Sequence, residues 1–161
     1  MPERKLTVFL VDDESIIRNG MKKLFDWESN GFTITGEAEN GRDALPLILS
    51  LKPDIIITDL KMPFCDGITL ASEIKKALPS AETVILTGYD EFEYAKAALQ
   101  VEAVDYILKP FSFEKIRKAA ERVRELLHKE ELLKMSVRVY GKKLLCRVID
   151  NDGETGREAC R

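Results

Sequence analysis

The chain has 161 residues, of which 45% are hydrophobic and 33% charged, and this is typical of one soluble globular domain with a short appendage. No apolar run approaches the ~18 residues of a membrane span, so we expect a cytoplasmic protein without membrane insertion. The net charge of −3 is uneven, with 12 Lys/Arg and 19 Asp/Glu in residues 1–111, and this acidic body argues against nucleic-acid binding by this chain alone.

Five short apolar runs rich in β-branched residues predict five strands. They are Leu6 to Val11, Phe32 to Gly36, Asp54 to Thr58, Thr83 to Thr87 and Asp105 to Leu108. The first and third runs are apolar without alternation, which is typical of central parallel strands that are covered on both faces.

Helical patterns lie between these runs, around residues 17–25, 44–49, 68–78 and 92–99, and a fifth helix is predicted from Ser112, a favourable N-cap. Pro46 indicates that the second helix begins late or is kinked. Regular alternation of strands and helices with short links predicts an α/β fold. We expect a doubly wound, five-stranded parallel sheet in the order 2-1-3-4-5, a flavodoxin-like (βα)5 arrangement.

The predicted domain covers residues 1–130. After Leu133 the apolar residues fit neither the helical nor the strand period, so residues 131–161 are predicted to be a linker or tail without assigned structure. The polar segment 150–158 contains two glycines and is expected to be disordered unless a partner binds it.

Polar residues end four of the predicted strands: Asp12 and Asp13 the first, Asp59 the third, Thr87 the fourth and Lys109 the fifth. In a doubly wound sheet these ends converge. Three carboxylates held together repel one another unless a cation neutralises them, and Mg²⁺ suits such hard oxygen ligands. A carboxylate beside that ion is a nucleophile able to form an acyl phosphate, with hydroxyl and ammonium donors for the phosphoryl oxygens. Each residue alone also has an ordinary explanation as a cap or turn residue.

These residues lie in motifs that resemble the receiver domain of two-component response regulators over residues 6 to about 128. The motifs are Val11-Asp12-Asp13-Glu14, Thr58-Asp59-Leu60-Lys61-Met62-Pro63 with Asp66-Gly67, Leu86-Thr87-Gly88 and Tyr106-Ile107-Leu108-Lys109-Pro110. The resemblance implies that a sensor histidine kinase phosphorylates Asp59. It also implies that Asp12, Asp13, Asp59 and the backbone carbonyl of Lys61 hold Mg²⁺.

The same resemblance implies that Lys109 contacts the phosphoryl group, that the Lys109-Pro110 bond is cis, and that Thr87 and Tyr106 form a switch pair. The alternative explanation of Tyr106 is an ordinary strand aromatic. Lys61 and Tyr89 are expected to tune the lifetime of the phosphoryl group. No enzyme activity is expected beyond magnesium-dependent self-phosphorylation from phosphodonors and self-dephosphorylation.

The segment Gly88 to Ala95, with Trp27 and Gly31-Phe32, is similar to receivers fused to AraC-type helix-turn-helix output domains, which suggests a role in transcriptional control. No output domain is predicted here. A homodimer through the fourth helix, fifth strand and fifth helix is expected on phosphorylation. A seam in the fifth helix through Ile116, Ala119, Val123 and Leu126 either extends this contact or packs on the sheet. Glu130 interrupts the seam, so no long coiled coil is expected.

Three other functions fit the sequence less well. A haloacid-dehalogenase-like phosphatase needs a second Asp two residues after the nucleophile, where this chain has Lys61. A pseudo-receiver that binds partners without accepting phosphate is opposed by the intact set of acidic residues. A flavodoxin-like cofactor carrier is opposed by Asp12-Asp13, since such a carrier has a Gly-rich phosphate loop at that strand end.

Overall fold

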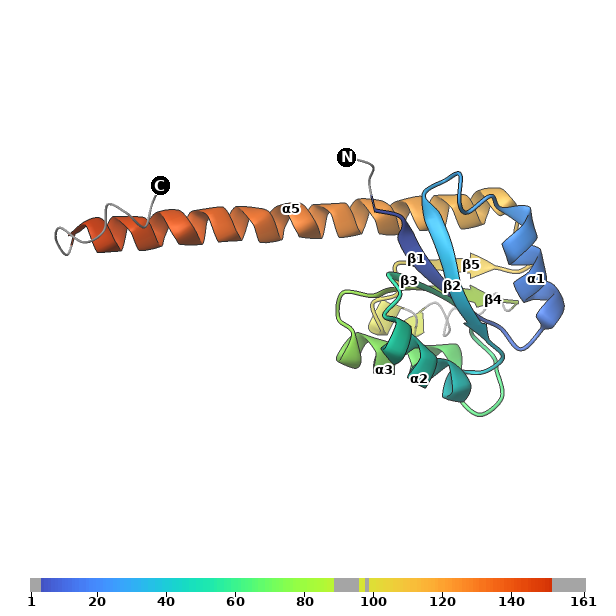
Figure 1. Cartoon of the computed structure of the whole chain (residues 1–161). Helices are drawn as coiled ribbons and strands as arrows, with labels where there is room; N and C mark the ends of the chain where they lie inside the picture. Colours follow the sequence, from blue (N-terminus) through green and yellow to red (C-terminus); the bar gives the residue numbers. More distant parts are fainter. Residues whose placement is uncertain (1–3, 89–95, 98, 152–161) are drawn as a thin grey trace. The chain divides into compact units, whose positions relative to one another are not determined.

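The structure is a computed structural model of the chain, and it describes residues 4–88, 96–97 and 99–151. Five parallel strands form one sheet in the order β2-β1-β3-β4-β5 (Figure 1). The strands are β1 (Leu6–Val11), β2 (Phe32–Ala38), β3 (Ile55–Asp59), β4 (Glu82–Thr87) and β5 (Asp105–Leu108). The predicted doubly wound α/β fold and its strand order are confirmed.

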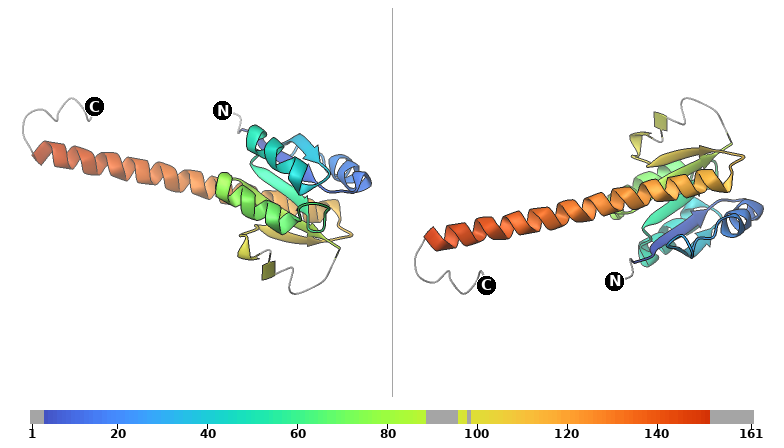
Figure 2. Two further views of the ribbon diagram at one scale, coloured as in Figure 1. Left: turned by 90° about the horizontal axis from the view of Figure 1, so that it is seen from below. Right: turned by 90° about the horizontal axis from the view of Figure 1, so that it is seen from above.

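Four long helices are described, and they are α1 (Ser15–Leu24), α2 (Gly41–Leu51), α3 (Gly67–Ala77) and α5 (Phe113–Asn151). Two of them, α2 and α3, cover one face of the sheet, and α1 and the start of α5 cover the other (Figures 1 and 2). Of the predicted fourth helix, residues 96–97 and 99–100 are helical. Its positions Phe92 and Ala95 lie outside the described residues.

The core explains why the central strands are continuously apolar. Every residue of β3 and β4, and the last four of β1, are buried. Phe9, Val11 and Ile56 pack with Ala44 and Ile48 of α2 and with Leu70 and Ile74 of α3. Helices on both faces leave no solvent-exposed side for polar residues. The polar residues are therefore restricted to the strand ends.

Helix α2 begins at Gly41, where Asn40 caps it by accepting a hydrogen bond from the backbone N–H of Asp43 at 2.8 Å. The expectation that Pro46 delays the start of this helix is therefore wrong. A side chain at position 41 would clash, because a Cβ there would lie 2.7 Å from the carbonyl oxygen of Cys65. Glycine thus lets the start of α2 pack onto the loop between β3 and α3.

The chain divides into two units, residues 1–124 and 125–161, and α5 contributes to both. In the first unit, Ile116, Ala119 and Val123 are 2%, 1% and 0% exposed. They pack inside the domain, so of the two alternatives for this seam the structure supports packing on the sheet at these three residues and not an extension of a dimer contact. In the second unit, residues 131–151 are helical, where the sequence pattern left the structure unassigned. The segment 150–158 was expected to be disordered, which is wrong for Asp150 and Asn151, and residues 152–158 lie outside the described residues.

None of the described helices combines the length with the low charge and high hydropathy that crossing a membrane requires.

Candidate functional site

The carboxyl ends of three strands place the central residues of the site. Thr58 pairs with Val11, and Asp59 pairs with Leu86, so Asp12, Asp59 and Thr87 end neighbouring strands. The backbone N–H of Lys109 donates to the carbonyl of Thr87 at 2.6 Å. The parallel register thereby brings the ends of β1, β3, β4 and β5 to one edge of the sheet, as the sequence predicts.

The ammonium of Lys109 bridges two buried carboxylates. Its Nζ lies 2.8 Å from Asp12 Oδ2 and 3.3 Å from Asp59 Oδ1. The side chain of Asp12 is fully buried and that of Asp59 is 9% exposed. One ammonium cannot neutralise two carboxylates, so this edge of the sheet attracts further cations.

The charge balance shows in the pKa of Asp59, which is raised from 3.8 to about 6. Burial is the main cause, the charge of Asp12 adds to it, and Lys109 opposes it. Burial works against the charge on Lys109, but hydrogen bonding to Asp12 and the charge of Asp59 outweigh it and raise the pKa of the ammonium. Asp59 is thus a carboxylate held in an environment that disfavours its charge, which a bound cation would reverse.

Three carboxylates in sequence form a compact cluster beside this pair. Oxygens of Asp12, Asp13 and Glu14 all lie within 4.8 Å of one another, with Asp12 buried and the other two exposed. Asp12 Oδ1 accepts the backbone N–H of Glu14 at 2.9 Å, which fixes the turn from β1 into α1. Hard oxygen donors of this kind fit Mg²⁺. Glu14 was missed as a candidate ligand, although the run Asp-Asp-Glu was visible in the sequence.

The remaining predicted residues lie around this centre. Lys61 is exposed in the loop that follows β3, and Thr87 is fully buried at the end of β4. Tyr106 is partly buried and packs against a cluster that includes Leu60 and Ile85. In this structure it therefore behaves as a packed strand aromatic. The Lys109-Pro110 bond is cis, as the resemblance implied, and Tyr89 lies outside the described residues.

Sequence reasoning missed Arg18, a buried cation behind the acidic edge. This side chain of α1 is 7% exposed, and its Nη1 donates to the backbone carbonyl of Asp12 at 2.6 Å. Glu37 of β2 and Glu39, which follows β2, lie 3.5 Å from the same guanidinium. The available signal was position: a residue in the first turn of a helix points back toward the strand end that precedes it.

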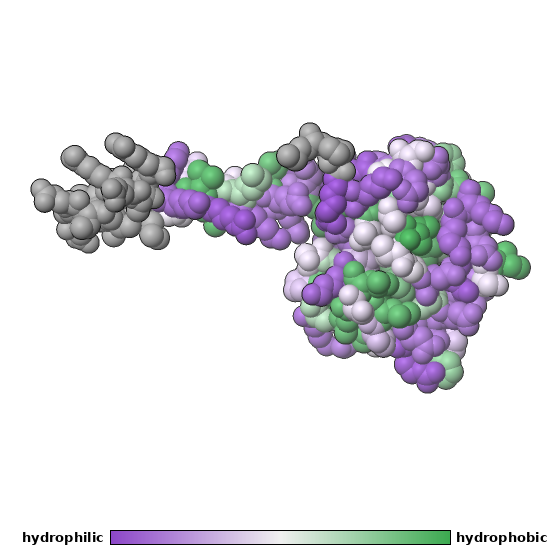
Figure 3. Space-filling model, viewed as in Figure 1, coloured by the Kyte–Doolittle hydropathy of each residue, from purple (hydrophilic) through white to green (hydrophobic). Residues whose placement is uncertain are grey.

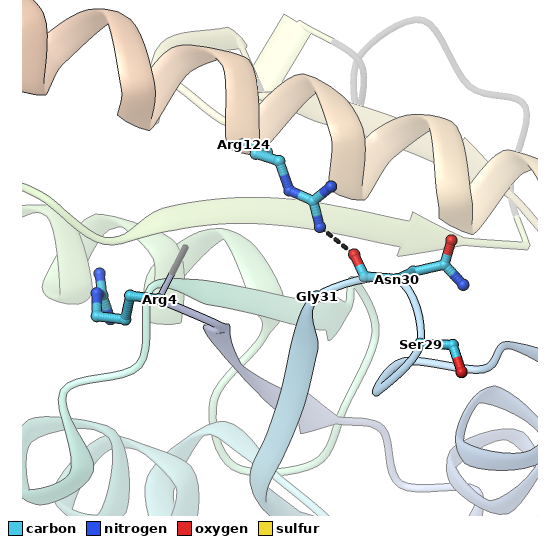
Figure 4. A pocket seen from close by; sticks show the side chains of 5 residues that line it. All are labelled: Arg4, Ser29, Asn30, Gly31 and Arg124. Atoms are coloured by element: carbon cyan, nitrogen blue, oxygen red, sulfur yellow. Dashed lines mark hydrogen bonds between the residues drawn. The ribbon is translucent and has the colours of Figure 1, made fainter. Parts of the chain in front are cut away.

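A pocket lies at the end of the sheet opposite to the acidic cluster (Figure 4). This pocket, of about 360 Å³, is lined by Arg4, Ser29, Asn30, Gly31 and Arg124. Arg124 donates to the carbonyl of Asn30 and stacks over the Phe32 ring, with its guanidinium carbon 4.3 Å from the ring centre. Arg4 is bonded to Asp54. Both guanidiniums thus have partners within the domain.

Comparison with known proteins identifies the family of the chain. The family model of the response regulator receiver domain matches residues 8–121, and the chain belongs to this family. It is 38% identical over 127 residues to the uncharacterized transcriptional regulatory protein YesN of Bacillus subtilis (strain 168), a match that covers 79% of this chain and 34% of YesN. It is 39% identical over 124 residues to the transcriptional regulatory protein HptR of Staphylococcus aureus (strain N315), which covers 76% of this chain and 48% of HptR. The chain thus spans a third to a half of these relatives.

Solved structures agree with this family and fold. The REC domain of AraT, a response regulator from Geobacillus stearothermophilus, has a TM-score of 0.74 and 38% identity, covering 79% of this chain and 98% of that chain. A two component transcriptional regulator AraC from Clostridium phytofermentans ISDg has a TM-score of 0.69 and 28% identity, covering 80% and 98%. A LuxR-family response regulator from Staphylococcus aureus is also similar, with a TM-score of 0.67 and 27% identity, covering 73% and 98%. The predicted resemblance to response-regulator receivers, including an AraC-type one, is confirmed.

Proposed function

We propose that this chain is a phosphoacceptor in which Asp59 takes a phosphoryl group from the phosphohistidine of a sensor histidine kinase. The observation that supports this most is the position of Asp59. Its carboxylate is almost buried, lies 3.3 Å from the ammonium of Lys109, and ends a strand beside the acidic cluster at Asp12. Phosphoryl transfer depends mainly on this kind of positioning and charge neutralisation.

The chemistry assigns one role to each side chain. An Asp59 oxygen attacks phosphorus, the O–P bond forms, and the N–P bond of the phosphohistidine breaks with its electron pair returning to the imidazole nitrogen. Lys109 supplies positive charge, and the Thr87 hydroxyl donates a hydrogen bond to the phosphoryl oxygens.

The metal site of the proposal consists of Asp12, Asp13, Asp59 and the carbonyl oxygen of Lys61. Their oxygen chemistry suits Mg²⁺, which when bound neutralises charge and offers a coordination position to a phosphoryl oxygen. The surplus of negative charge around Lys109 supports this assignment. In the same proposal, Lys61 and Tyr89 set how long the phosphoryl group survives.

Phosphorylation replaces the single negative charge of the Asp59 carboxylate with a phosphoryl group that carries about −1.5 to −2 charges. This charge competes with Asp12 for Lys109 and attracts the Thr87 hydroxyl, and Tyr106 turns into the space that Thr87 vacates. The change biases an existing equilibrium between two conformations rather than creating a new fold. The expected output is a homodimer through the fourth helix, β5 and α5, in the service of transcriptional control. Cytoplasmic location stays a prediction.

Intact-mass measurement after treatment with acetyl phosphate and Mg²⁺ tests the phosphoacceptor. The chain should gain one phosphoryl group, and Asp59→Asn should gain none. Asp66→Asn is the matched control, because Asp66 is a nearby exposed carboxylate that caps α3 and Asn is an equally good N-cap. Equal phosphorylation of the wild type and Asp59→Asn would show that another residue is the nucleophile.

Calorimetric titration with Mg²⁺ tests the metal site separately. Replacing both Asp12 and Asp13 with Ala should abolish binding, because it removes two of the proposed ligands. The control replaces Asp26 and Glu28 with Ala, which removes the same charge from exposed residues outside the acidic cluster. Unchanged titration of the Asp12/Asp13 variant would place the magnesium site elsewhere.

A further inference from the structure

The second unit presents an unusual number of exposed apolar side chains on one helix. Among the described side chains of residues 125–143, seven large apolar residues are between 39% and 71% exposed: Leu126, Leu132, Leu133, Met135, Val137, Val139 and Tyr140. Figure 3 shows hydrophobic and hydrophilic side chains in separate bands along this helix. In proteins, most of the stability of a helix comes from packing of its apolar face against another surface.

The apolar side chains fall into two stripes of unequal length. Leu126, Leu133 and Tyr140 recur every seven residues. Val137 lies four residues after Leu133 and three residues before Tyr140. This is the spacing of alternating core positions in a coiled coil. In sequence, the same spacing continues to Leu144. The other stripe, Leu132, Met135 and Val139, covers only two turns.

We propose that the longer stripe pairs with the same stripe of a second copy of this chain, forming a parallel, two-stranded coiled coil. The types of residue in the stripe favour a parallel pair of two copies of this helix. Val137 is β-branched at the position called a, and Leu126, Leu133 and Tyr140 occupy the position called d. A β-branched residue at a with Leu at d favours two parallel strands over trimers or tetramers.

Glu130 occupies the one charged a position between Leu126 and Tyr140, and the sequence supplies its partners. In a parallel pair, an a side chain packs beside the g side chain of the opposite helix, and that g position holds Lys129. Lys134 lies four residues after Glu130 on the same helix, the favourable order for an ion pair. Charged groups at a single a position weaken a coiled coil but fix its register and orientation. In this proposal Glu130 sets the register of the coiled coil, whereas the apolar seam was expected from the sequence to be interrupted at Glu130.

This interface differs from the phosphorylation-dependent dimer proposed above, and it does not rest on phosphotransfer. Its residues all lie beyond Arg124, in the second unit. It is expected to form with or without a phosphoryl group on Asp59. The Asp59→Asn variant should therefore dimerise like the wild type, so failure of the coiled coil and failure of the phosphoacceptor are distinguishable.

Sedimentation equilibrium of the full chain tests the interface with two matched double variants. Leu133→Lys/Val137→Lys introduces two charges into the proposed seam, and Leu132→Lys/Val139→Lys makes the same chemical change on the other stripe. The seam variant should raise the dimer dissociation constant by about 100-fold or more, because it buries unpaired charge. The control variant should stay within about threefold of the wild type. Circular dichroism confirms that both remain helical.

Two outcomes of this experiment overturn the proposal. One is a wild-type chain that sediments as a monomer at about 100 μM, well above the range in which a specific interface operates. The other is an equal loss of dimer in both double variants, which would indicate nonspecific association of apolar surface.

Disulfide cross-linking tests the parallel orientation. In a chain whose Cys65, Cys146 and Cys160 are replaced with Ser, Val137→Cys should form a cross-linked dimer, because identical a positions face each other only in a parallel pair. Arg138→Cys, one residue further and outside the seam, should not. A dimer in sedimentation without cross-linking at position 137 would show that the helices do not pair in parallel.

Discussion

Strand β3 has an aspartate at each end, and the two carboxyl groups have opposite properties. Asp54 precedes the strand, and its pKa is lowered: burial opposes the charge, but hydrogen bonds from Arg4 and Thr7 outweigh burial. Asp59 ends the strand, and its pKa is raised to about 6, with burial as the main cause. Their side chains are buried to a similar extent, with that of Asp54 16% exposed and that of Asp59 9% exposed. Burial alone therefore does not decide which carboxylate is stable.

The number of hydrogen-bond donors around each carboxylate determines whether its pKa is lowered or raised. Asp54 accepts from Arg4 Nη1 and Nη2 at 3.0 and 2.9 Å and from the N–H and hydroxyl of Thr7 at 2.8 and 3.0 Å. Asp59 shares the single ammonium of Lys109 with Asp12, which binds it at the shorter distance. The carboxylate of Asp54 has enough donors to stabilise its charge, and it stabilises the fold. The carboxylate of Asp59 lacks a full compensating positive charge, which favours binding of a cation and a phosphoryl group.

Removing the shared cation should have the largest effect. We expect Lys109→Met to lower the free energy of unfolding at neutral pH by about 3 kcal/mol, because it leaves two buried carboxylates without their shared cation. Urea denaturation in metal-free buffer measures the change. In an Asp59→Asn background the loss should be clearly smaller, since one of the two charges is then absent. Equal losses in both backgrounds would show that Lys109 and Asp59 are not coupled.

Removing the charge of Asp59 should act in the opposite direction. A pKa raised from 3.8 to about 6 means that the unfolded chain ionises first, so wild-type stability falls as the pH rises from about 4 to about 6. Asp59→Asn avoids this loss and should be about 2 to 3 kcal/mol more stable at pH 7 in metal-free buffer. The difference should vanish below pH 4. Urea denaturation across this pH range gives the comparison, and a constant difference would contradict it.

The same measurement on Asp54 should give the reverse pH dependence. Asp54→Ala leaves the N–H of Thr7 without its side-chain acceptor and should cost about 2 kcal/mol at pH 7. Because the pKa of Asp54 is lowered in the folded state, its stabilisation is present above the unfolded value of 3.8 and is lost as the pH falls through the folded value. The variant and the wild type should therefore converge in acid. A gap that widens on acidification would rule out this role.

The smallest expected effect concerns Arg18, which acts on the site only through the backbone of Asp12. Arg18→Ala should weaken Mg²⁺ binding by about tenfold, as loss of a group that orients a ligand typically does. Arg18→Lys keeps a donor and should recover part of the affinity. Calorimetric titration decides between this positioning role and a purely structural one, in which thermal stability falls while the affinity of the folded protein for Mg²⁺ is unchanged.

Much of this site could be predicted because strand ends are easy to locate. Strands buried on both faces are continuously apolar, so Asp12, Asp59 and Thr87 mark their ends, and the parallel topology brings those ends together. Arg18 could not be predicted from periodicity, because a charged residue on a helix usually faces solvent. Its burial depends on the neighbouring carboxylates of Glu37 and Glu39.

The length of α5 escaped prediction for a different physical reason. Beyond Leu133, apolar residues occupy two sides of the helix, as Met135 and Val137 do, and the two stripes together hide the helical period. The packing of Ile116 and Val123 could not be predicted, because an apolar stripe has the same spacing whether it packs on a sheet or on a partner helix. The spacing shows which side of a helix is apolar, but it does not show what packs against that side.

The contacts of Arg124 also bear on how this protein can be shortened. The family match ends at residue 121, yet Arg124 reaches across to the turn before β2, where it bonds to Asn30 and stacks on Phe32. A chain cut at residue 121 loses this contact between α5 and the start of β2, together with the buried side chain of Val123, whereas one cut after Arg124 keeps both. A shortened chain should therefore extend at least three residues beyond the end of the family match.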